Sequence, residues 1–115
     1  MECDEVMVNG VVYVPKNAQT DGLTYVIVRT YSAGVFAGYL RSRDGSEVVL
    51  EKARRLWQWA GAASLSQLAM EGTSKPANCK FPCEVDSITL LGVIELIPVR
   101  PKAQKSIAEV PIWKA

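Results

Sequence analysis

The dipeptide Asp44-Gly45 constrains the fold most, because it lies between two long segments, 34–42 and 46–56, that both contain several apolar residues. Asp-Gly is one of the strongest sequence signals for a β-hairpin turn. The length of the turn decides which side chains share a face, since a shift of one residue moves every side chain of a strand to the other face. Residues 34–56 are therefore expected to form two antiparallel strands.

The side chains that each turn brings together favour one length. A two-residue loop would place Val48 and Leu50 on the same face as two arginines. A three-residue loop over residues 43–45, with Gly45 left-handed as a bulge, places Arg41 across from Glu47, an opposite-charge pair. It also groups apolar side chains on one face: Phe36, Leu40, Val48, Leu50 and Leu56. We expect the bulged three-residue turn.

The opposite face of this hairpin is then rich in aromatic and charged side chains. Its members in the predicted register are Tyr39, Arg41, Glu47, Val49, Glu51, Arg55, Trp57 and Trp59.

The other segments predict an α+β, mainly β fold. Residues 23–30 have the apolar run of a buried strand, and residues 84–99 return to strand character with Gly92 as a bulge or bend. A short helix is expected over about 64–71, because Ser64 and Gln67 form a capping box and Gly72 follows. Residues 102–110 suggest a short amphipathic turn.

Together these elements predict a small antiparallel sheet of five or six strands with one capped short helix. Asn9-Gly10 lies between two β-branched runs and predicts an N-terminal β-hairpin over residues 1–16. Residues 23–115 are expected to form a single α+β domain, since 115 residues leave room for little more than one domain.

The sequence contains no histidine. It therefore lacks the side chain that ordinarily titrates near neutral pH, the base of Ser-His and Cys-His relays, and imidazole metal ligands. We expect no catalytic residues, no cofactor and no metal, since Cys79 and Cys83 have only Cys3 as a further thiol. An enzyme would have to use Asp, Glu, Lys or Tyr chemistry.

Charge and hydropathy point to a cytoplasmic protein that binds neither membranes nor long nucleic acids. The net charge is +1, which provides no overall field toward polyanions. No apolar run is long enough to cross a bilayer, and the first five residues are acidic where a signal peptide would be basic.

The aromatic and basic face is the candidate ligand-binding site. Trp and Arg two residues apart on a strand offer a ring for stacking a nucleobase and planar cationic donors for a phosphate. The turn after residue 30 could add backbone N–H donors. The candidate residues are Tyr31, Ser32, Tyr39, Arg41, Arg54, Arg55, Trp57, Trp59 and Lys75.

A structural role is the alternative for the same residues. Trp57 and Trp59 could anchor the helix or a second subunit, with Arg55 paired to Glu51 or Glu47 as a surface ion pair. Trp113 lies on a short C-terminal tail, and we expect it to make an oligomer contact.

Several stretches resemble a family of small proteins of tailed bacteriophages and prophages that is catalogued as a domain of unknown function. The resemblance covers about residues 24–115 and includes VIVRTYSAGV (26–35), ARRLWQW (53–59) and SLSQLA (64–69). Residues 8–16 are similar to a hairpin cap found on many phage proteins. The resemblance implies a non-structural phage protein in the cytoplasm of the infected host.

The resulting hypothesis is a non-enzymatic, homo-oligomeric host-defence antagonist. It would bind and sequester a nucleotide-type immune signal, such as a cyclic nucleotide, through the arginine and tryptophan side chains. Two alternatives stay open: an inhibitor or adaptor that binds a host or phage protein, and a minor virion or assembly component.

Overall fold

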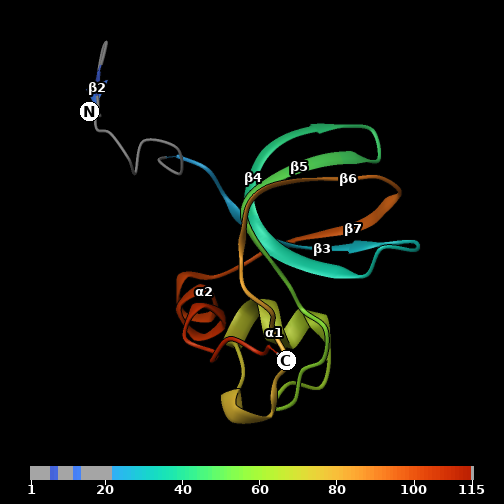
Figure 1. The fold of residues 1–115 in the computed structure, drawn as a ribbon, viewed down its shortest axis with the longest axis vertical. Helices are drawn as coiled ribbons and strands as arrows, with labels where there is room; N and C mark the ends of the chain where they lie inside the picture. The colour runs from blue at the N-terminus through green and yellow to red at the C-terminus, as the bar shows by residue number, and fades with distance from the viewer. Residues whose placement is uncertain (1–5, 8–11, 14–21, 115) are drawn as a thin grey trace.

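The computed structural model describes residues 6–7, 12–13 and 22–114 (Figure 1). A five-stranded antiparallel sheet has the order β6-β5-β4-β3-β7. Its strands are β3 (Tyr25–Thr30), β4 (Val35–Asp44), β5 (Glu47–Arg55), β6 (Val85–Leu90) and β7 (Val93–Pro98). The helices are α1 (Leu65–Glu71), the 3-10 turn η2 (Pro76–Asn78) and α2 (Pro101–Ala108). The predicted α+β, mainly β class is confirmed.

The N-terminal hairpin is described only by its strands, β1 (Val6–Met7) and β2 (Val12–Tyr13). Val6 pairs with Tyr13 and Met7 with Val12, which is the register that a two-residue turn at Asn9-Gly10 requires. That turn lies outside the described residues. The division into a hairpin over 1–16 and a domain over 23–115 stays a prediction.

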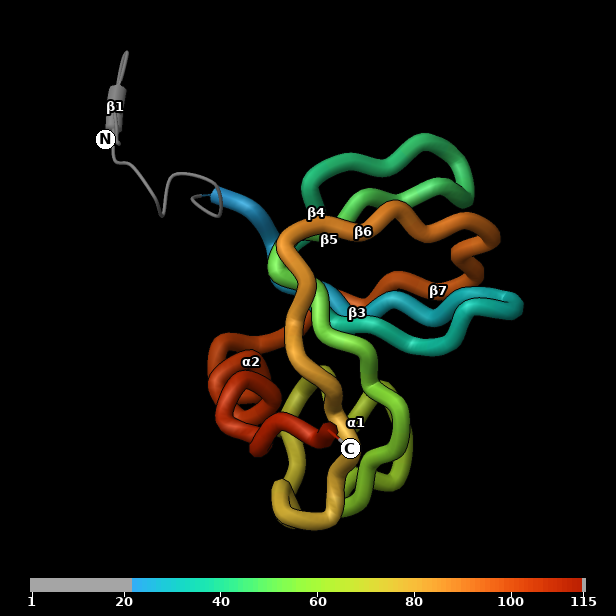
Figure 2. Tube along the Cα trace, in the orientation of Figure 1, coloured from blue at the N-terminus to red at the C-terminus, as the bar shows by residue number. Residues whose placement is uncertain are grey.

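The sheet is open but strongly curled. Strands β6 and β7 are its two edges, yet only Leu91 and Gly92 separate them in the chain. Gly92 has φ +71°, a value that suits glycine in so tight a connection. Figures 1 and 2 show the chain folding back from β6 into β7, so that the two edges approach each other at this turn.

The curled sheet has an apolar core on each of its two faces. Strand β3 lies between the two cores and is therefore buried on both faces. The core inside the curled sheet contains Val26, Val28, Phe36, Val48, Leu50, Ala53 and Leu90. The core between the outer face of the sheet and the helices contains Ile27, Ala37, Leu56, Leu68, Ala69, Cys79, Phe81, Ile107 and Val110. Figure 1 shows α1 and α2 side by side on one side of the sheet. Two-sided burial explains the uninterrupted apolar run of β3.

The β4–β5 turn differs from the predicted three-residue loop. Asp44 pairs with Glu47, which leaves a two-residue turn, and Gly45 has the expected left-handed φ of +62°. The extra residue lies in β4 instead, where the register shifts between Leu40 and Ser42 at Arg41. This bulge restores the predicted grouping of Leu40, Phe36, Val48 and Leu50 around the inner core. The predicted pairing of Arg41 with Glu47 is wrong.

A second irregularity, at Lys52, overturns the predicted faces beyond that point. Lys52 has φ +51°, rare outside glycine, and the register with β4 shifts opposite Gly38. A Cβ on Gly38 would lie 3.0 Å from the Ala53 Cα, so a side chain here would push β5 away and glycine suits this close approach. Past the bulge the alternation is inverted: Ala53 enters the inner core, and Leu56 joins the outer core instead of the predicted one.

The predicted capped helix is confirmed as α1. The Ser64 hydroxyl accepts a hydrogen bond from Gln67 N (3.2 Å), and the Gln67 side chain accepts one from Ala63 N (2.7 Å). Gly72 ends α1 with φ +78°. Residues 102–110 were expected to form only a short amphipathic turn, but Pro101–Ala108 form a second helix, α2, which buries Ala103 and Ile107. Within the described part of the chain, no helix is long and apolar enough to cross a membrane.

Candidate functional site

A cleft of about 290 Å³ lies between the β3–β4 turn and the segment that leaves β5. One wall consists of Ser32, Ala33, Gly34 and Val35, and the other of Arg55, Leu56, Trp57 and Trp59. We call these eight residues the turn cleft. Four predicted site residues, Ser32, Arg55, Trp57 and Trp59, therefore line one cavity.

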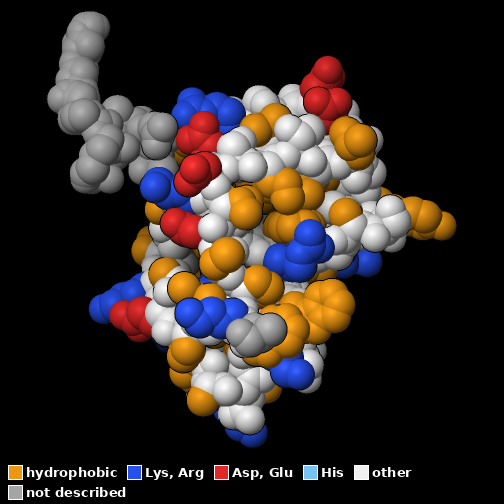
Figure 3. Space-filling model, in the orientation of Figure 1, with side chains coloured by type: hydrophobic (Ala, Val, Ile, Leu, Met, Phe, Trp, Pro, Cys, Tyr) orange, Lys and Arg blue, Asp and Glu red, His pale blue; other side chains and the backbone are white. Residues whose placement is uncertain are grey.

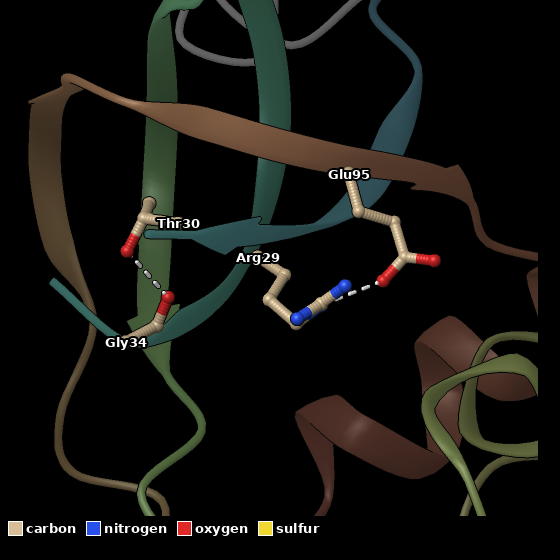
Figure 4. Close-up of polar contacts among 4 residues, drawn as sticks. All are labelled: Arg29, Thr30, Gly34 and Glu95. Carbon is tan, nitrogen blue, oxygen red and sulfur yellow. Dashed lines mark hydrogen bonds and ion pairs between the residues drawn. The ribbon is translucent and has the colours of Figure 1, made fainter. Parts of the chain in front are cut away.

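Thr30 holds the turn wall in place (Figure 4). Its hydroxyl donates to Gly34 O (2.8 Å) and accepts from Ala33 N (2.8 Å), and its backbone N–H also donates to Gly34 O (2.9 Å). Tyr31 N donates to Gly92 O (2.8 Å), which ties this turn to the β6–β7 turn. The backbone N–H groups of Tyr31 and Ala33 are thus already used. Among the described residues, the N–H groups of Ser32 and Gly34 have no partner.

Arg55 forms the cationic wall of the turn cleft. Its guanidinium carbon lies 4.3 Å from the centroid of the Phe36 ring, and Nη1 donates to Ala33 O (2.6 Å). The inverted alternation after Lys52 places Arg55 over Phe36 instead of beside Glu51. No carboxylate among the described residues pairs with Arg55. Arg29, by contrast, is bound to Glu95 at 2.9 Å (Figure 4). The remaining N–H groups of Arg55 can bind an anion.

A residue from the C-terminal tail, Trp113, stacks beside the aromatic part of the cleft without lining it. The Trp57 ring stacks with that of Trp113 at a centroid distance of 6.4 Å and an angle of 10°. Lys80 Nζ lies 5.5 Å from the Trp113 centroid. The Trp57 side chain is still 62% exposed, whereas Trp59 is partly buried against the outer core. Trp57 can therefore offer ring surface to a ligand.

Backbone pairing fixes the tail that carries Trp113. Trp113 N donates to Phe81 O (3.0 Å), and Phe81 forms a parallel bridge with Ile112. Lys80 in turn bridges Gln58. Trp113 thus packs within its own chain and is 44% exposed. Its predicted contact with another subunit stays a prediction.

Arg54 does not face the turn cleft. Its side chain is 7% exposed and donates to five backbone carbonyls at 2.7–3.2 Å: those of Phe81, Pro82, Ile107, Val110 and Pro111. Burial is the main cause that lowers the pKa of this guanidinium from its usual value. Arg54 joins the C-terminal segment to the loop before β6, which is a structural role.

The other predicted site residues lie apart from the cleft. Arg41 forms a two-pronged ion pair with Glu51 (2.7 and 2.9 Å), and this hydrogen bonding raises the pKa of Arg41. The Tyr39 hydroxyl accepts from Gln104 Nε2 (2.7 Å) on α2. Lys75 is exposed before η2, and Tyr31 is 84% exposed on the turn without lining the cleft. The residues predicted to share one face therefore lie in separate places, and only some of them line the turn cleft.

Sequence reasoning missed the contributions of Phe36, Lys80 and Thr30. Phe36 was expected only in the core, and nothing in its spacing indicated that Arg55 would lie over its ring. The Thr30-to-Gly34 spacing could have suggested a side-chain-closed turn.

The face shown in Figure 3 combines apolar and basic side chains. Hydrophobic side chains gather near the C-terminal end of the chain with Lys and Arg among them, while Asp and Glu lie toward the upper and left margins. Among the described residues, no group of three His, Cys, Asp or Glu side chains could hold a metal ion.

Comparison with known proteins gives a family but no characterised relative. Neither the curated proteins nor the solved structures contain a match to this chain. A family model described as "Domain of unknown function (DUF6948)" matches residues 23–107, which includes all of the turn cleft. The chain therefore belongs to the DUF6948 family.

Proposed function

We propose that the protein binds a nucleotide-type anion in the turn cleft and holds it without chemical change. The observation that carries this proposal is Arg55, a guanidinium with no carboxylate partner among the described residues, in one cleft with Trp57 and Trp59. Arginine and tryptophan together suit a phosphate joined to an aromatic base.

The parts of the cleft match the parts of a nucleotide. Contact with Phe36 and Ala33 O holds Arg55 in place, so little side-chain entropy is lost when it binds a phosphate. The hydroxyl and N–H of Ser32 on the opposite wall can donate to a phosphate or a sugar. A volume of about 290 Å³ suits one nucleotide unit, either a cyclic mononucleotide or half of a cyclic dinucleotide.

The resemblance to phage proteins supplies the biological setting of this proposal. In that setting the protein acts in the host cytoplasm as a homo-oligomer and sequesters a cyclic nucleotide immune signal. Sequestration needs no catalytic group, which agrees with a site built from side chains of constant charge.

Intrinsic fluorescence tests the proposal directly, because all three tryptophans of the chain line the turn cleft or stack beside it. Cyclic mono- and dinucleotides are titrated into the purified protein. We expect at least one to change the emission saturably. Arg55→Met should weaken binding about tenfold or more, since a hydrogen bond to a charged group contributes about 1.5–3 kcal/mol.

The matched control is Arg43→Met, which removes an arginine at the opposite end of β4 from the cleft residue Val35. This variant should bind as the wild type does. Circular dichroism checks that both variants fold. If no nucleotide changes the emission up to about 1 mM, the proposal fails, because that limit corresponds to only about 4 kcal/mol of binding.

A protein partner is the second candidate function, favoured by the exposed apolar side chains beside the cleft. Trp57, Ile112 and Trp113 are 62%, 58% and 44% exposed. Aromatic side chains are enriched in protein interfaces. A partner that is captured stoichiometrically from infected cells by the wild type and lost with Trp113→Ala supports this candidate. Mass spectrometry of purified particles tests the virion alternative.

A further inference from the structure

A second cavity, of about 340 Å³, lies between the outer face of the sheet and α2. It shares no lining residue with the turn cleft. Tyr25 and Tyr39 form an aromatic wall, with their ring centroids 5.1 Å apart and their planes at 80°. Ala108, Val110 and Ile112 supply apolar surface. The cavity therefore has room for a small apolar group beside two aromatic rings.

Neutral hydrogen-bonding groups also line this cavity. Gln104 Nε2 donates to the Tyr39 hydroxyl at 2.7 Å, which leaves the Tyr39 proton free to donate to a ligand. The Tyr25 hydroxyl has no hydrogen-bond partner among the described residues. Burial, the largest cause, raises the pKa of Tyr25, so this hydroxyl is neutral at physiological pH. Both phenols can thus donate hydrogen bonds into the cavity.

Three charged side chains line the same cavity. Arg54 is already bound to five backbone carbonyls, whereas Lys52 and Glu84 carry opposite charges and do not pair. Lys52 and Glu84 form no ion pair with each other or with any other described residue. Lys52 is the residue with φ +51°, the single non-glycine residue with positive φ in the described chain. Bulges of this kind redirect side chains and occur often beside binding sites. The strained backbone thus coincides with the cationic wall of the cavity.

We propose that this cavity binds a free α-amino acid with an apolar side chain. The ligand carboxylate lies against Lys52, its ammonium lies against Glu84, and its side chain contacts the tyrosine rings and the apolar wall. A simple anion would leave Glu84 repelling it, whereas a zwitterion uses both charges. This inference does not rest on the nucleotide proposal, because the two cavities have no residue in common.

The test compares one amino acid with two derivatives that each lack one charge. L-leucine is titrated against N-acetyl-L-leucine, which lacks the ammonium, and L-leucinamide, which lacks the carboxylate. Calorimetry measures affinity, and backbone amide NMR signals of Tyr39 and Gln104 locate the site. We expect leucine to bind at least about tenfold more tightly than either derivative.

Two variants test which charge of the ligand Lys52 and Glu84 each bind. Lys52→Gly removes the ammonium and suits the left-handed backbone, and it should make leucine and leucinamide bind equally. Glu84→Gln is an exposed change, and it should make leucine and N-acetyl-leucine bind equally. Trp57→Ala, in the turn cleft, should leave the affinities for leucine and its two derivatives unchanged. Equal binding of all three compounds to the wild type, or no shift of the two signals up to about 10 mM leucine, overturns the proposal.

Discussion

Replacement of Arg54 by methionine should destabilise the protein more than any other single loss of charge in the described chain. The substitution keeps an apolar stem of similar length but removes every donor of the guanidinium. The carbonyls of Phe81, Ile107 and Val110, whose bonds to Arg54 are buried, then lose their partner. These three carbonyls belong to the loop before β6 and to the C-terminal segment, so both should loosen together.

The expected change in the free energy of unfolding of Arg54→Met is the sum of two opposing contributions. Each buried carbonyl left unpaired costs about 1–3 kcal/mol. Removal of a buried charge, however, also removes a desolvation penalty of several kcal/mol. We expect a net loss of about 2–4 kcal/mol in the free energy of unfolding, a large share of the roughly 5–15 kcal/mol of a typical domain.

Urea unfolding followed by tryptophan fluorescence and circular dichroism measures this loss. Arg29→Met is the matched control, because the ion pair of Arg29 with Glu95 is exposed and should contribute less than about 1 kcal/mol. The fluorescence of folded Arg54→Met should also differ from wild type, since Trp113 follows the segment that Arg54 holds. An Arg54→Met protein within 1 kcal/mol of wild type, with an unchanged urea dependence, would refute the structural role of this residue.

Three further predictions concern the turn, the bulge and pH. Thr30→Val should lower the free energy of unfolding by about 1–2 kcal/mol in urea titrations, since both hydrogen bonds of the Thr30 hydroxyl are lost. Thr30→Ser should recover most of this stability, and an equal loss in the two variants would contradict the reasoning. Gly38→Ala should lower the free energy of unfolding by about 1–3 kcal/mol through overpacking, because the added Cβ would lie 3.0–3.1 Å from the β5 backbone. A melting temperature equal to that of the wild type would contradict this and show that β5 can move away. The affinity for a cyclic phosphodiester should be constant from about pH 6 to 8 in fluorescence titrations, because the chain has no histidine and arginine stays charged. A bell-shaped dependence of affinity on pH would contradict this, because it would point to a titrating group in the site.

The sequence was sufficient for the type of the sheet strands and of α1, whereas α2 was expected only as a turn. The Asp-Gly turn, the capping box at Ser64 and the Gly72 stop are local signals, and local signals were enough for the β4–β5 hairpin and α1. The apolar run at 26–28 predicted a largely buried strand, and its side chains are buried: Val26 and Val28 in one core and Ile27 in the other.

Strand faces could not be predicted because they depend on contacts between strands. Each β-bulge inverts the alternation that follows it, and the bulge at Lys52 is made possible by the absence of a side chain at Gly38 in the neighbouring strand. Arg54, which was expected in the ligand site, is consequently buried, and Arg55 lines the cleft over Phe36 instead of beside Glu51.

The candidate site was predicted only in part for the same reason. Ser32, Arg55, Trp57 and Trp59 come together because the β3–β4 turn lies beside the end of β5, where Phe36 pairs with Arg55. Trp113 reaches the site through the bridge between Phe81 and Ile112, a long-range contact with no local sequence signal.

The most direct test of the central claim is a tryptophan fluorescence titration of wild type, Arg55→Met and Arg43→Met with a panel of cyclic nucleotides. The turn cleft as a nucleotide site predicts a saturable change in wild type and Arg43→Met, and about tenfold or greater weakening in folded Arg55→Met. Equal affinity of Arg55→Met and wild type for the same nucleotide would contradict it, because Arg55 is the cation on which the site depends.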